Sequence, residues 1–391
     1  MLTQPYDKIS PAMQSRYLSL SPYNLVRIIL GEKSSSDTDR DNVYTRAAAL
    51  LDAWIKDRVL DRESEPSLYA YFQRFTVPDT GETLERKGFI GLGAVEDYSA
   101  NVVHRHEQTL SGPKKDRLEL LRHTHAHFGQ IFMLYPDPEL SVDKILDQTA
   151  SSASPMLSLK DEYGALHRVW KISDPTTISR IQELMSSKKL LIADGHHRYE
   201  TALAFRNENP GWKDAEKVMM TFVNMHSPGL EILATHRVVG GLAGFDKTAF
   251  QRGIGGRALK SLDELRELFR TPASSRIRIG IALRSGEIWL YDRPRNPGEL
   301  DVQVLHQELL GRLLGIGEEA VREQKHIEYV RGLEAAYAKV RDGAAEIAFL
   351  LEPTTIRQVS DVAFSGGVMP QKSTDFYPKL LSGVTIYKLA R

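Results

Sequence analysis

Short apolar runs alternate with amphipathic helical patterns along the chain, and this alternation limits the possible folds more than any other feature of the sequence. Residues 67–77 and 88–99 have the composition of strands, whereas residues 43–60 place Leu51 and Trp54 on one apolar stripe of a helix. Chains in which strands and helices alternate in this way build mixed α/β (α+β) folds. We therefore expect an α/β protein.

Charge balance and the lack of cysteine exclude several classes of protein. The 391 residues include 51 Lys and Arg against 51 Asp and Glu, so no overall field attracts nucleic acid or an anionic membrane. With Cys 0, disulfides, thiolate metal sites and cysteine nucleophiles are excluded. No apolar run reaches the roughly 20 residues that span a membrane, and the amino-terminal residues do not resemble a signal peptide. We expect a cytoplasmic protein, and the sequence leaves its oligomeric state open.

A glycine-rich segment at residues 240–245 marks a change of composition and divides the chain into two expected domains, 1–240 and 241–391. In the second, residues 276–294 alternate around Ser285-Gly286 and predict a hairpin, and residues 326–343 have a helical pattern. Before the boundary, two strand patterns are joined by the turn signal Ser-Pro-Gly.

A strand pattern changes into a helix pattern within residues 190–205. The turn holds Asp194, Gly195, His196, His197 and Arg198. A glycine turn that starts a helix leaves backbone N–H groups pointing outward, and the helix dipole adds positive charge there. Arg198 and the two histidines can donate to phosphate oxygens, while Asp194 can hold Mg²⁺ or orient a histidine. The turn predicts a phosphate-binding site, and we expect its ligand to be a nucleotide rather than free phosphate.

Structural and metal-binding interpretations of the histidines and of Asp194 stay open. Asp194 alone would serve as a helix N-cap, and the histidines of the turn would serve as satisfied buried side chains. Zinc suits adjacent histidines poorly, because helical metal ligands are spaced four residues apart. His123, His125 and His127 would share one face of a strand and suit a metal, although the residues before them have a helical pattern, which would spread them around the helix.

Four separated blocks of the sequence resemble one family. PYDKIS at residues 5–10, HEQT at 106–109, IADGHHRYETAL at 192–203 and MPQKSTDFYPKL at 369–380 are similar to segments of DUF1015, a family of bacterial and archaeal proteins. The resemblance runs nearly end to end. It implies membership of the ParB/sulfiredoxin superfamily, and hence a ParB/sulfiredoxin-like core that binds nucleotide phosphate at a helix start, followed by a second α/β domain.

The residue after the glycine separates the branches of that superfamily. Sulfiredoxins carry a cysteine where this chain has His196, so sulfinic acid reduction is excluded. ParB proteins combine a CTP-binding box with a basic DNA-binding domain, which the neutral charge does not favour. The free-serine kinase branch resembles this chain in DGHHR and in an HEQ element, here His106, Glu107 and Gln108. In that branch the glutamate is the general base, which implies the same role for Glu107.

Phosphoryl transfer needs a held phosphate chain and a carboxylate that accepts the hydroxyl proton. The expected catalytic residues are Glu107, Asp194 and His196, with ADP or ATP as the nucleotide and Mg²⁺ at Asp194. The residues expected to bind the nucleotide or its phosphates are Gly195, His197, Arg198, His106, Thr109, Lys372, Ser373 and Thr374. The two blocks around Glu107 and Asp194 are far apart in the sequence, so the helices between them must form an insertion.

Both ends of the chain are expected to reach the same site. Residues 365–391 form a tail that we expect to fold back to the first domain, since 369–379 is a polar loop with a lysine and two hydroxyls suited to phosphate. The expected substrate contacts are Tyr6, Asp7, Tyr23, Asn24, Arg27 and Lys379. The amino-terminal residues among them fit a cap-and-turn role equally well.

The sequence therefore favours a nucleotide-dependent phosphotransferase acting on a small hydroxyl substrate, with free L-serine as the first candidate. A nucleotide-binding regulatory module without turnover is the alternative. A third interpretation is a ParB-like DNA-associated factor or nuclease, for which residues 113–123 are the candidate recognition helix.

Overall fold

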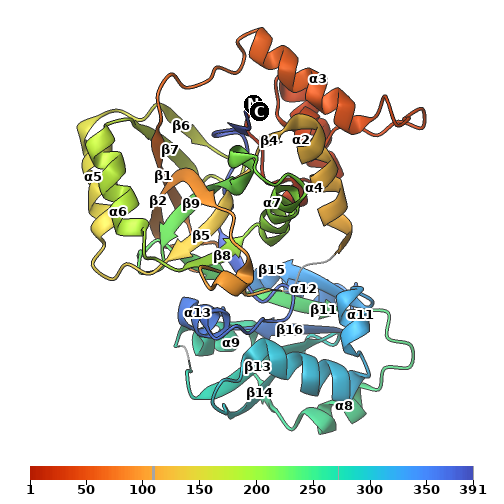
Figure 1. Ribbon diagram of the computed structural model, residues 1–391. Coiled ribbons are helices and arrows are strands. Elements are labelled where there is room, and N and C mark those ends of the chain that lie inside the picture. Colours follow the sequence, from red (N-terminus) through yellow and green to blue (C-terminus); the bar gives the residue numbers. More distant parts are fainter. Residues whose placement is uncertain (108–110, 272, 391) are drawn as a thin grey trace.

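The computed structural model describes residues 1–107, 111–271 and 273–390, and the chain forms two lobes that are each built on a separate sheet (Figure 1). The N-terminal lobe holds an eight-stranded sheet. Its strands are β1 (Leu68–Thr76), β2 (Thr83–Ala94), β3 (Val103–His104), β5 (Ile131–Tyr135), β6 (Leu157–Lys160), β7 (Leu166–Ile172), β8 (Leu190–Asp194) and β9 (Lys217–Asn224). They lie in the order β3-β8-β5-β9-β2-β1-β7-β6. β5 runs parallel to β9 and antiparallel to β8, so the sheet is mixed.

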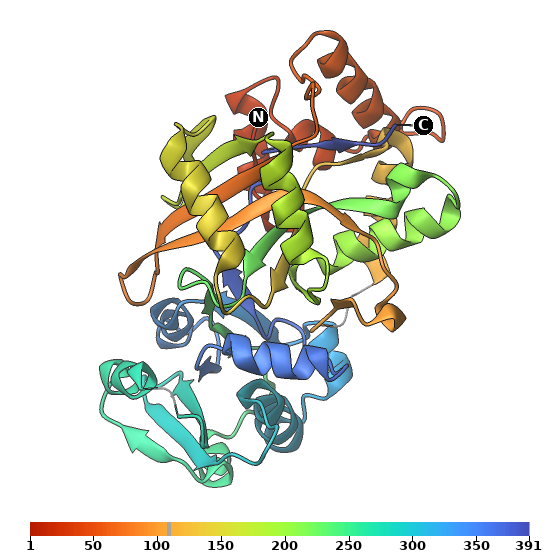
Figure 2. The same cartoon turned by 60° about the vertical axis from the view of Figure 1, so that its left-hand side comes forward.

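The central strands are apolar because both faces of the sheet are covered. Every residue of β5 is buried, as are the first four of β8. Helices α5 (Ser141–Ser152) and α6 (Pro175–Met185) cover one face, where they lie side by side in Figure 2. The opposite face packs against Val359 of α13 (Ile356–Phe364) and against Phe376 of the tail. The C-terminal segment is thus part of the core of the N-terminal lobe.

Several helices flank one end of this sheet. They are η1 (Tyr6–Lys8), α1 (Pro11–Leu20), α2 (Val26–Ile29), α3 (Val43–Lys56), α4 (Ser111–Thr124) and α7 (His196–Glu208), with short turns at η2 (Tyr98–Ala100) and η3 (Lys213–Glu216). A capping box between Asn42 and Thr45 starts α3. Leu51 and Trp54 of α3 pack in one cluster with Leu120 of α4. α4 in turn packs beside α7, as Figure 1 shows.

The C-terminal lobe holds a six-stranded antiparallel sheet in the order β12-β14-β13-β16-β11-β15. These strands are β11 (Thr235–Val239), β12 (Arg257–Leu259), β13 (Arg276–Leu283), β14 (Ile288–Pro294), β15 (Ile327–Arg331) and β16 (Ile347–Leu351). Helices α9 (Leu262–Arg270) and α12 (Leu333–Arg341) pack on one face. The other face packs against α8 (Lys247–Ile254), α10 (Asp301–Val304), the π-helix η4 (Leu305–Leu313) and α11 (Glu318–Arg322).

Two local expectations for the C-terminal lobe have different outcomes. The hairpin around Ser285-Gly286 is confirmed by the antiparallel pairing of β13 and β14. The helix expected over residues 326–343 is wrong in its first part, where β15 forms a strand. Gly332, at φ 86°, separates β15 from α12, and the β-branched and aromatic residues before it favour a strand.

The chain crosses from one lobe to the other after β9 and then returns. β9 lies in the eight-stranded sheet and β11 in the six-stranded sheet, so the strands around Ser-Pro-Gly do not pair, and the second sheet begins ahead of residue 240. In the tail, β17 (Asp375–Tyr377) pairs with β10 (Glu231–Leu233), and β18 (Tyr387–Lys388) pairs with β4 (Ala126–His127).

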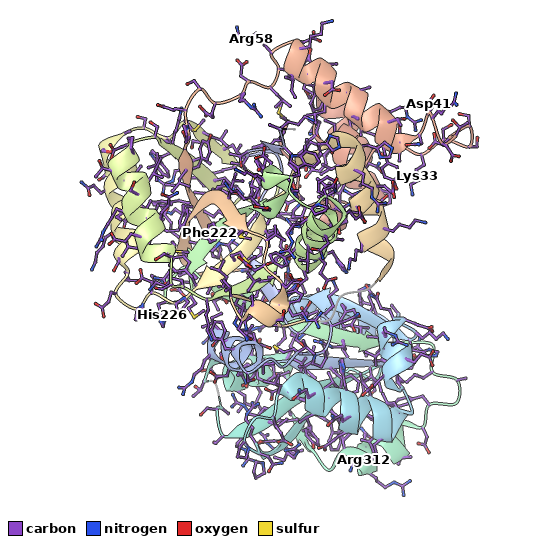
Figure 3. All side chains as sticks on the ribbon, in the orientation of Figure 1. Lys33, Asp41, Arg58, Phe222, His226 and Arg312 are labelled. Carbon is purple, nitrogen blue, oxygen red and sulfur yellow. The ribbon has the colours of Figure 1, made fainter. Side chains whose placement is uncertain are left out.

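Side chains fill both lobes, and charged ones such as Arg58 and Arg312 project from their far ends (Figure 3). Over the residues described, the structure contains no helix with the length and apolar character that crossing a membrane requires.

Candidate functional site

The chain passes from β8 to α7 through Gly195, which is the N-cap of the helix with φ 96° and ψ 26°. This left-handed backbone favours glycine, and a Cβ here would lie 3.0 Å from the guanidinium of Arg198. Among the described residues no side chain caps α7, and the first N–H groups of a helix have no partner within it. The corner therefore leaves amide donors at the positive end of the helix dipole, an arrangement suited to an anion.

Asp194 does not cap the helix, because both of its oxygens accept hydrogen bonds from cations. Lys379 Nζ lies 3.0 Å from Oδ1, and a guanidinium nitrogen of Arg198 lies 2.6 Å from Oδ2. Burial would raise the pKa of Asp194, but Lys379 and Arg198 lower that pKa well below its ordinary value. Burial would likewise lower the pKa of Lys379, but Asp194 and Asp375 raise it. Both groups are therefore charged at neutral pH.

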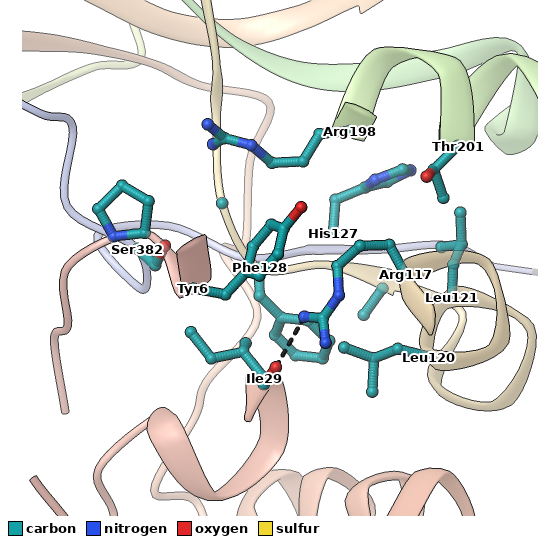
Figure 4. Close-up of a pocket in the computed structure, with 13 residues that line it drawn as sticks. Tyr6, Ile29, Arg117, Leu120, Leu121, His127, Phe128, Arg198, Thr201 and Ser382 are labelled. Atoms are coloured by element: carbon teal, nitrogen blue, oxygen red, sulfur yellow. Dashed lines mark hydrogen bonds between the residues drawn. The ribbon is translucent and has the colours of Figure 1, made fainter. Parts of the chain in front are cut away.

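Arg198 lines a small cavity of about 60 Å³. Its guanidinium donates to the carbonyl oxygen of Gln130 as well as to Asp194. Figure 4 shows Arg198 and Arg117 at this cavity, the one from α7 and the other from α4. The space is large enough for a few waters, since holding one water takes about 10–15 Å³ of such volume. As placed, Arg198 fixes Asp194, and the phosphate clamp that the sequence predicts would require its guanidinium to change partners.

The segment that carries His106 and Glu107 lies against both β8 and the tail. Met369 N donates to the carbonyl oxygen of His106 at 2.7 Å, and Glu107 forms a parallel bridge with Met369. The imidazole of His106 lies 2.8 Å from the carbonyl oxygen of Ile192 through Nδ1 and 2.8 Å from Thr374 Oγ1 through Nε2. Because a carbonyl only accepts, Nδ1 carries the proton, and Nε2 accepts from the hydroxyl.

His106 and His196 are both neutral at neutral pH. Their ring centroids lie 4.8 Å apart. Burial lowers the pKa of His106, and burial together with His106 lowers the pKa of His196 well below its ordinary value. His196 is nevertheless not sealed in the apolar core, because it lines the cavity described next.

A cavity of about 390 Å³ lies between the lobes, and we refer to it as the interlobe cavity. Its walls come from the N-terminal segment, the two predicted blocks, the C-terminal lobe and the tail. They include Asp7, Lys8, Glu107, Asp194, His196, Thr235, Tyr329, Arg331, Lys372, Thr374, Asp375 and Lys379. Segments that are far apart in the sequence thus meet here, and Glu107 shares one cavity with the glycine corner.

Three buried polar atoms in the walls of this cavity have no hydrogen-bond partner among the described residues. They are Oε1 of Glu107, Nε2 of His196 and the phenol oxygen of Tyr329. Buried polar groups in folded proteins are nearly always satisfied, so each exception asks for an explanation. Three exceptions in residues around one cavity make its walls a candidate site for a polar ligand.

The charges of the walls are balanced, but they are not all paired. Asp375 accepts from Arg331 and also pairs with Lys379. Lys8 and Lys372, by contrast, have no ion-pair partner in the part of the chain that the structure describes. Burial lowers the pKa of Lys8, and the charges of Lys379 and Lys372 lower it further. Cations crowded in this way are stabilised by a bound anion.

The C-terminal lobe supplies wall residues that the sequence analysis missed. Tyr329 and Arg331 come from β15, and Thr235 from the start of β11. Behind them Arg237 is fully buried, and its guanidinium donates to the carbonyl oxygens of Thr235 and Lys372. The only available signal was a short run of β-branched and aromatic residues within a pattern that we took for a helix.

The tail residues of the predicted phosphate loop have different positions. Lys372 and Thr374 line the interlobe cavity. Ser373 is buried: its hydroxyl donates to the carbonyl oxygen of Pro370, and its own carbonyl oxygen accepts from Thr354. Ser373 thus holds the loop in shape. His197 follows His196 at the start of α7 and is half-buried, and Thr109 lies outside the described residues.

The predicted substrate contacts lie in three different parts of the structure. Asp7 and Lys379 line the interlobe cavity, whereas Tyr6 lines the smaller one, where its ring lies 4.3 Å from the Arg117 guanidinium. Tyr23, Asn24 and Arg27 lie elsewhere, the first two in the turn before α2 and Arg27 within α2 itself. Tyr23 packs on Trp54, Asn24 accepts from the Val26 N–H, and Arg27 donates to the carbonyl oxygens of Leu18 and Ser21. These contacts are those of a cap-and-turn role.

The three closely spaced histidines do not converge. His123 lies in the last turn of α4 and stacks on Tyr44. His125 packs on Trp212, and His127 stacks on Tyr387. The chain leaves the helix at His125, which has φ 48°, so the three side chains point to different neighbours.

The helix considered for DNA recognition, α4, holds its described arginines against the protein itself. Arg117 donates to Asp116 and to the carbonyl oxygen of Ile29. Arg122 pairs with Glu119 and Glu208. Guanidiniums engaged in this way are less available to phosphates of DNA.

Magnesium fits the residues around Asp194 poorly. Mg²⁺ requires oxygen ligands in near-octahedral geometry, and both oxygens of Asp194 already accept from cations. Within residues 1–107, 111–271 and 273–390, no three His, Asp or Glu side chains gather as a metal site. The arrangement does not support the expected role of Asp194 as a metal ligand.

The fold and the site define a mixed α/β protein with two lobes, in which a glycine-started helix and a buried carboxylate face one cavity. The chain belongs to the DUF1015 family, described as a protein of unknown function, whose model matches residues 1–310. One of the four resembling blocks, residues 369–380, lies beyond the matched part. A comparison with curated proteins gives no match.

Several solved structures match this chain at low sequence identity. A mutant of a free serine kinase in complex with ADP has a TM-score of 0.39 and 11% identity, covering 73% of this chain and 87% of that chain. A conserved hypothetical protein from Pyrococcus furiosus has a TM-score of 0.37 and 12% identity, with 73% and 90% covered. SbnI with a C-terminal truncation, from Staphylococcus aureus, has a TM-score of 0.38 and 12% identity, with 75% and 85% covered.

Proposed function

We propose that this protein binds ADP or ATP by its phosphates at the start of α7 and transfers a phosphoryl group to a small hydroxyl compound, with free L-serine as the first candidate. The observation that carries the proposal is the position of Glu107. Its carboxylate lines the same cavity as the glycine corner, and its Oε1 is buried without a partner among the described residues. A carboxylate held beside a phosphate site is suited to accept the proton of an attacking hydroxyl. The proposal includes a ParB/sulfiredoxin-like core.

The phosphate side of the site rests on donors and cations that have no partner among the residues described. The first amides of α7, the Lys372 ammonium and the Nε2 of His196 would donate to phosphate oxygens. Lys8 adds a further positive charge to the same cavity. Asp194 and Lys379 are paired with each other and would shape the wall.

In the transfer step, the acceptor oxygen forms a bond to phosphorus while its O–H bond breaks. The proton passes to Glu107, and the bond between phosphorus and the bridging oxygen breaks, which releases the nucleotide with one phosphate fewer. His106 is a positioning residue. Its bonds to Ile192 and Thr374 hold the segment that carries Glu107 against β8 and the tail. No step uses a metal ion.

Labelled nucleotide tests the proposal. The protein is incubated with ATP labelled at the γ-phosphate, or ADP labelled at the β-phosphate, and a panel of hydroxy amino acids. We expect label on the acceptor and a loss of about 10²-fold or more in rate for Glu107→Gln, as for other general bases. Glu139→Gln, at an exposed position, is the matched control and should behave as the wild type. Absence of transfer, or an unchanged rate in Glu107→Gln, would reject the proposal.

A regulatory module without turnover is the second candidate, and the state of Asp194 favours it. The carboxylate nearest the corner is already neutralised by two cations, so a nucleotide could bind there without any metal-assisted chemistry. Calorimetric binding of ADP or ATP without transfer or hydrolysis would favour this candidate.

A further inference from the structure

Tyr329, a residue of the C-terminal lobe, lines the interlobe cavity. The residue lies in β15, and its phenol oxygen is buried without a hydrogen-bond partner among the described residues. Two other buried atoms that lack a partner among the described residues, Oε1 of Glu107 and Nε2 of His196, come from the N-terminal lobe. The proposed function uses those two and leaves the phenol unexplained.

The ring of Tyr329 packs against Arg237 on the neighbouring strand. Arg237 and Tyr329 are direct partners in the antiparallel pairing of β11 with β15, and the guanidinium of Arg237 lies 5.2 Å from the centre of the ring. Arg237 in turn donates to the carbonyl oxygens of Gln371 and Lys372 in the tail. A hydroxyl on a clamped ring is a preorganised donor, because binding a ligand costs it little conformational freedom.

The wall behind Tyr329 carries the charge of Arg237, which the nearby carboxylate of Glu107 partly offsets. Arg237 is buried, and in the described part of the chain it bonds to carbonyl oxygens rather than to a carboxylate. Burial lowers the pKa of Arg237 to about 10, so it remains charged at neutral pH. Burial raises the pKa of Tyr329, so the phenol keeps its proton and donates. A neutral donor in front of a buried cation is suited to an anionic group.

We propose that Tyr329 positions the phosphoryl acceptor by donating a hydrogen bond to a carboxylate of that acceptor, which makes the acceptor a small hydroxy acid. This inference rests on the proposed function. The acceptor hydroxyl faces Glu107, while the carboxylate lies against Tyr329 with the charge of Arg237 behind it. The C-terminal lobe therefore supplies the specificity of the site, and the helix start and Lys372 hold the nucleotide.

Two variants that each remove one phenol oxygen test the proposal. Tyr329→Phe removes the unpartnered hydroxyl and keeps the ring under Arg237, so the fold should persist. Tyr337→Phe is the matched control from the same lobe, since its hydroxyl donates to the carbonyl oxygen of Gly286 at 3.3 Å. The full-length protein loaded with ADP is titrated calorimetrically with L-serine, D-glycerate and glycerol, and transfer to each compound is measured in parallel.

We expect L-serine and D-glycerate to bind the wild type more tightly than glycerol. A hydrogen bond to a charged group corresponds to about 10- to 100-fold in affinity. Tyr329→Phe should therefore lower the affinity for both carboxylates by about that factor and leave the affinities for glycerol and ADP unchanged. In transfer assays the loss should appear in KM of the acceptor. Tyr337→Phe should match the wild type throughout.

The outcomes separate this inference from the proposed function. Equal binding of the carboxylates by Tyr329→Phe and the wild type would overturn it, as would a wild type that binds neither carboxylate, even where transfer to another hydroxyl compound is seen. Tyr329-dependent binding of the carboxylates without any transfer would support the carboxylate site and reject the phosphotransferase.

Discussion

Replacing Lys379 with methionine tests the electrostatics of the corner directly. Its ammonium lies 3.0 Å from Asp194 and 3.2 Å from Asp375, and the Lys379 side chain is 10% exposed. Removing one partner of a buried ion pair typically costs about 3–5 kcal/mol, because the other charge stays buried. Arg198 and Arg331 still pair with the two carboxylates, so we expect the lower end, about 3 kcal/mol of the free energy of unfolding.

The pH dependence of this loss has a definite sign. Because the folded pKa of Asp194 is depressed, its stabilising contribution is present above the unfolded value of about 3.9 and disappears as the pH falls through the folded pKa. Without Lys379, only Arg198 and more distant cations oppose the effect of burial, so the folded pKa of Asp194 rises and its contribution shrinks. The difference between wild type and variant should therefore be full at neutral pH and narrow as the pH falls below about 5.

Urea unfolding followed by tryptophan fluorescence measures this difference at several pH values. Lys388→Met is the matched control, because that tail lysine bonds a single carbonyl oxygen, of Thr124, at 2.8 Å. Combining Lys379→Met with Asp194→Asn should cost less than the sum of the two single losses, since both substitutions remove the same ion pair. A loss equal to that of Lys388→Met, or one that grows toward acid pH, would refute the reasoning.

We expect Gly195→Ala to cost about 1–2 kcal/mol in urea unfolding and to weaken calorimetric binding of ADP, because its φ is 96° and a Cβ would lie 3.0 Å from the Arg198 guanidinium. Gly211→Ala, at φ 83° with nothing within 4 Å of the Cβ, isolates the backbone strain and should leave ADP binding intact; equal losses of binding would contradict the role of the corner. Burial lowers the pKa of His236 and of His306 to about 3 in the folded protein, whereas a histidine of the unfolded chain has a pKa of about 6.5. Below about pH 6.5 the unfolded chain therefore binds more protons than the folded protein, and the free energy of unfolding should fall as the pH drops. Urea midpoints at stepped pH measure this slope, which should flatten in His306→Gln; an unchanged slope would show that His306 does not contribute.

Local patterns in the sequence were enough to predict individual elements. The β13–β14 hairpin and the strand–glycine–helix corner at residues 190–205 are specified by residues that are neighbours in the chain. The position of Glu107 is different in kind. It depends on hydrogen bonds that join His106 with Ile192, Met369 and Thr374, which no periodicity encodes. Only the family resemblance put those blocks together.

Tyr329 was missed because two signals conflict within residues 326–343. The spacing of apolar residues fits one long helix, whereas Gly332 ends β15 with φ 86° before α12 begins. Pairing with β11 settles the conflict, since every residue of β15 has a partner on β11, and Tyr329 lies opposite Arg237. The β-branched and aromatic residues before Gly332 were the available hint, because such residues favour a strand.

The tail determines whether the cavity exists as one site, because residues 369–379 are bonded to both lobes. Met369 and Thr374 bond His106 of the N-terminal lobe, while Lys372 accepts from Arg237 of the C-terminal lobe through its carbonyl oxygen. Lys372 has φ 58°, a strained conformation for a residue with a side chain, which persists because bonds on both sides fix the loop. A ligand that engages the Lys372 ammonium therefore acts on a loop that sets the positions of both Glu107 and Tyr329. Nucleotide binding at this loop should for that reason change the affinity for the acceptor, and the acceptor should change the affinity for nucleotide by the same factor.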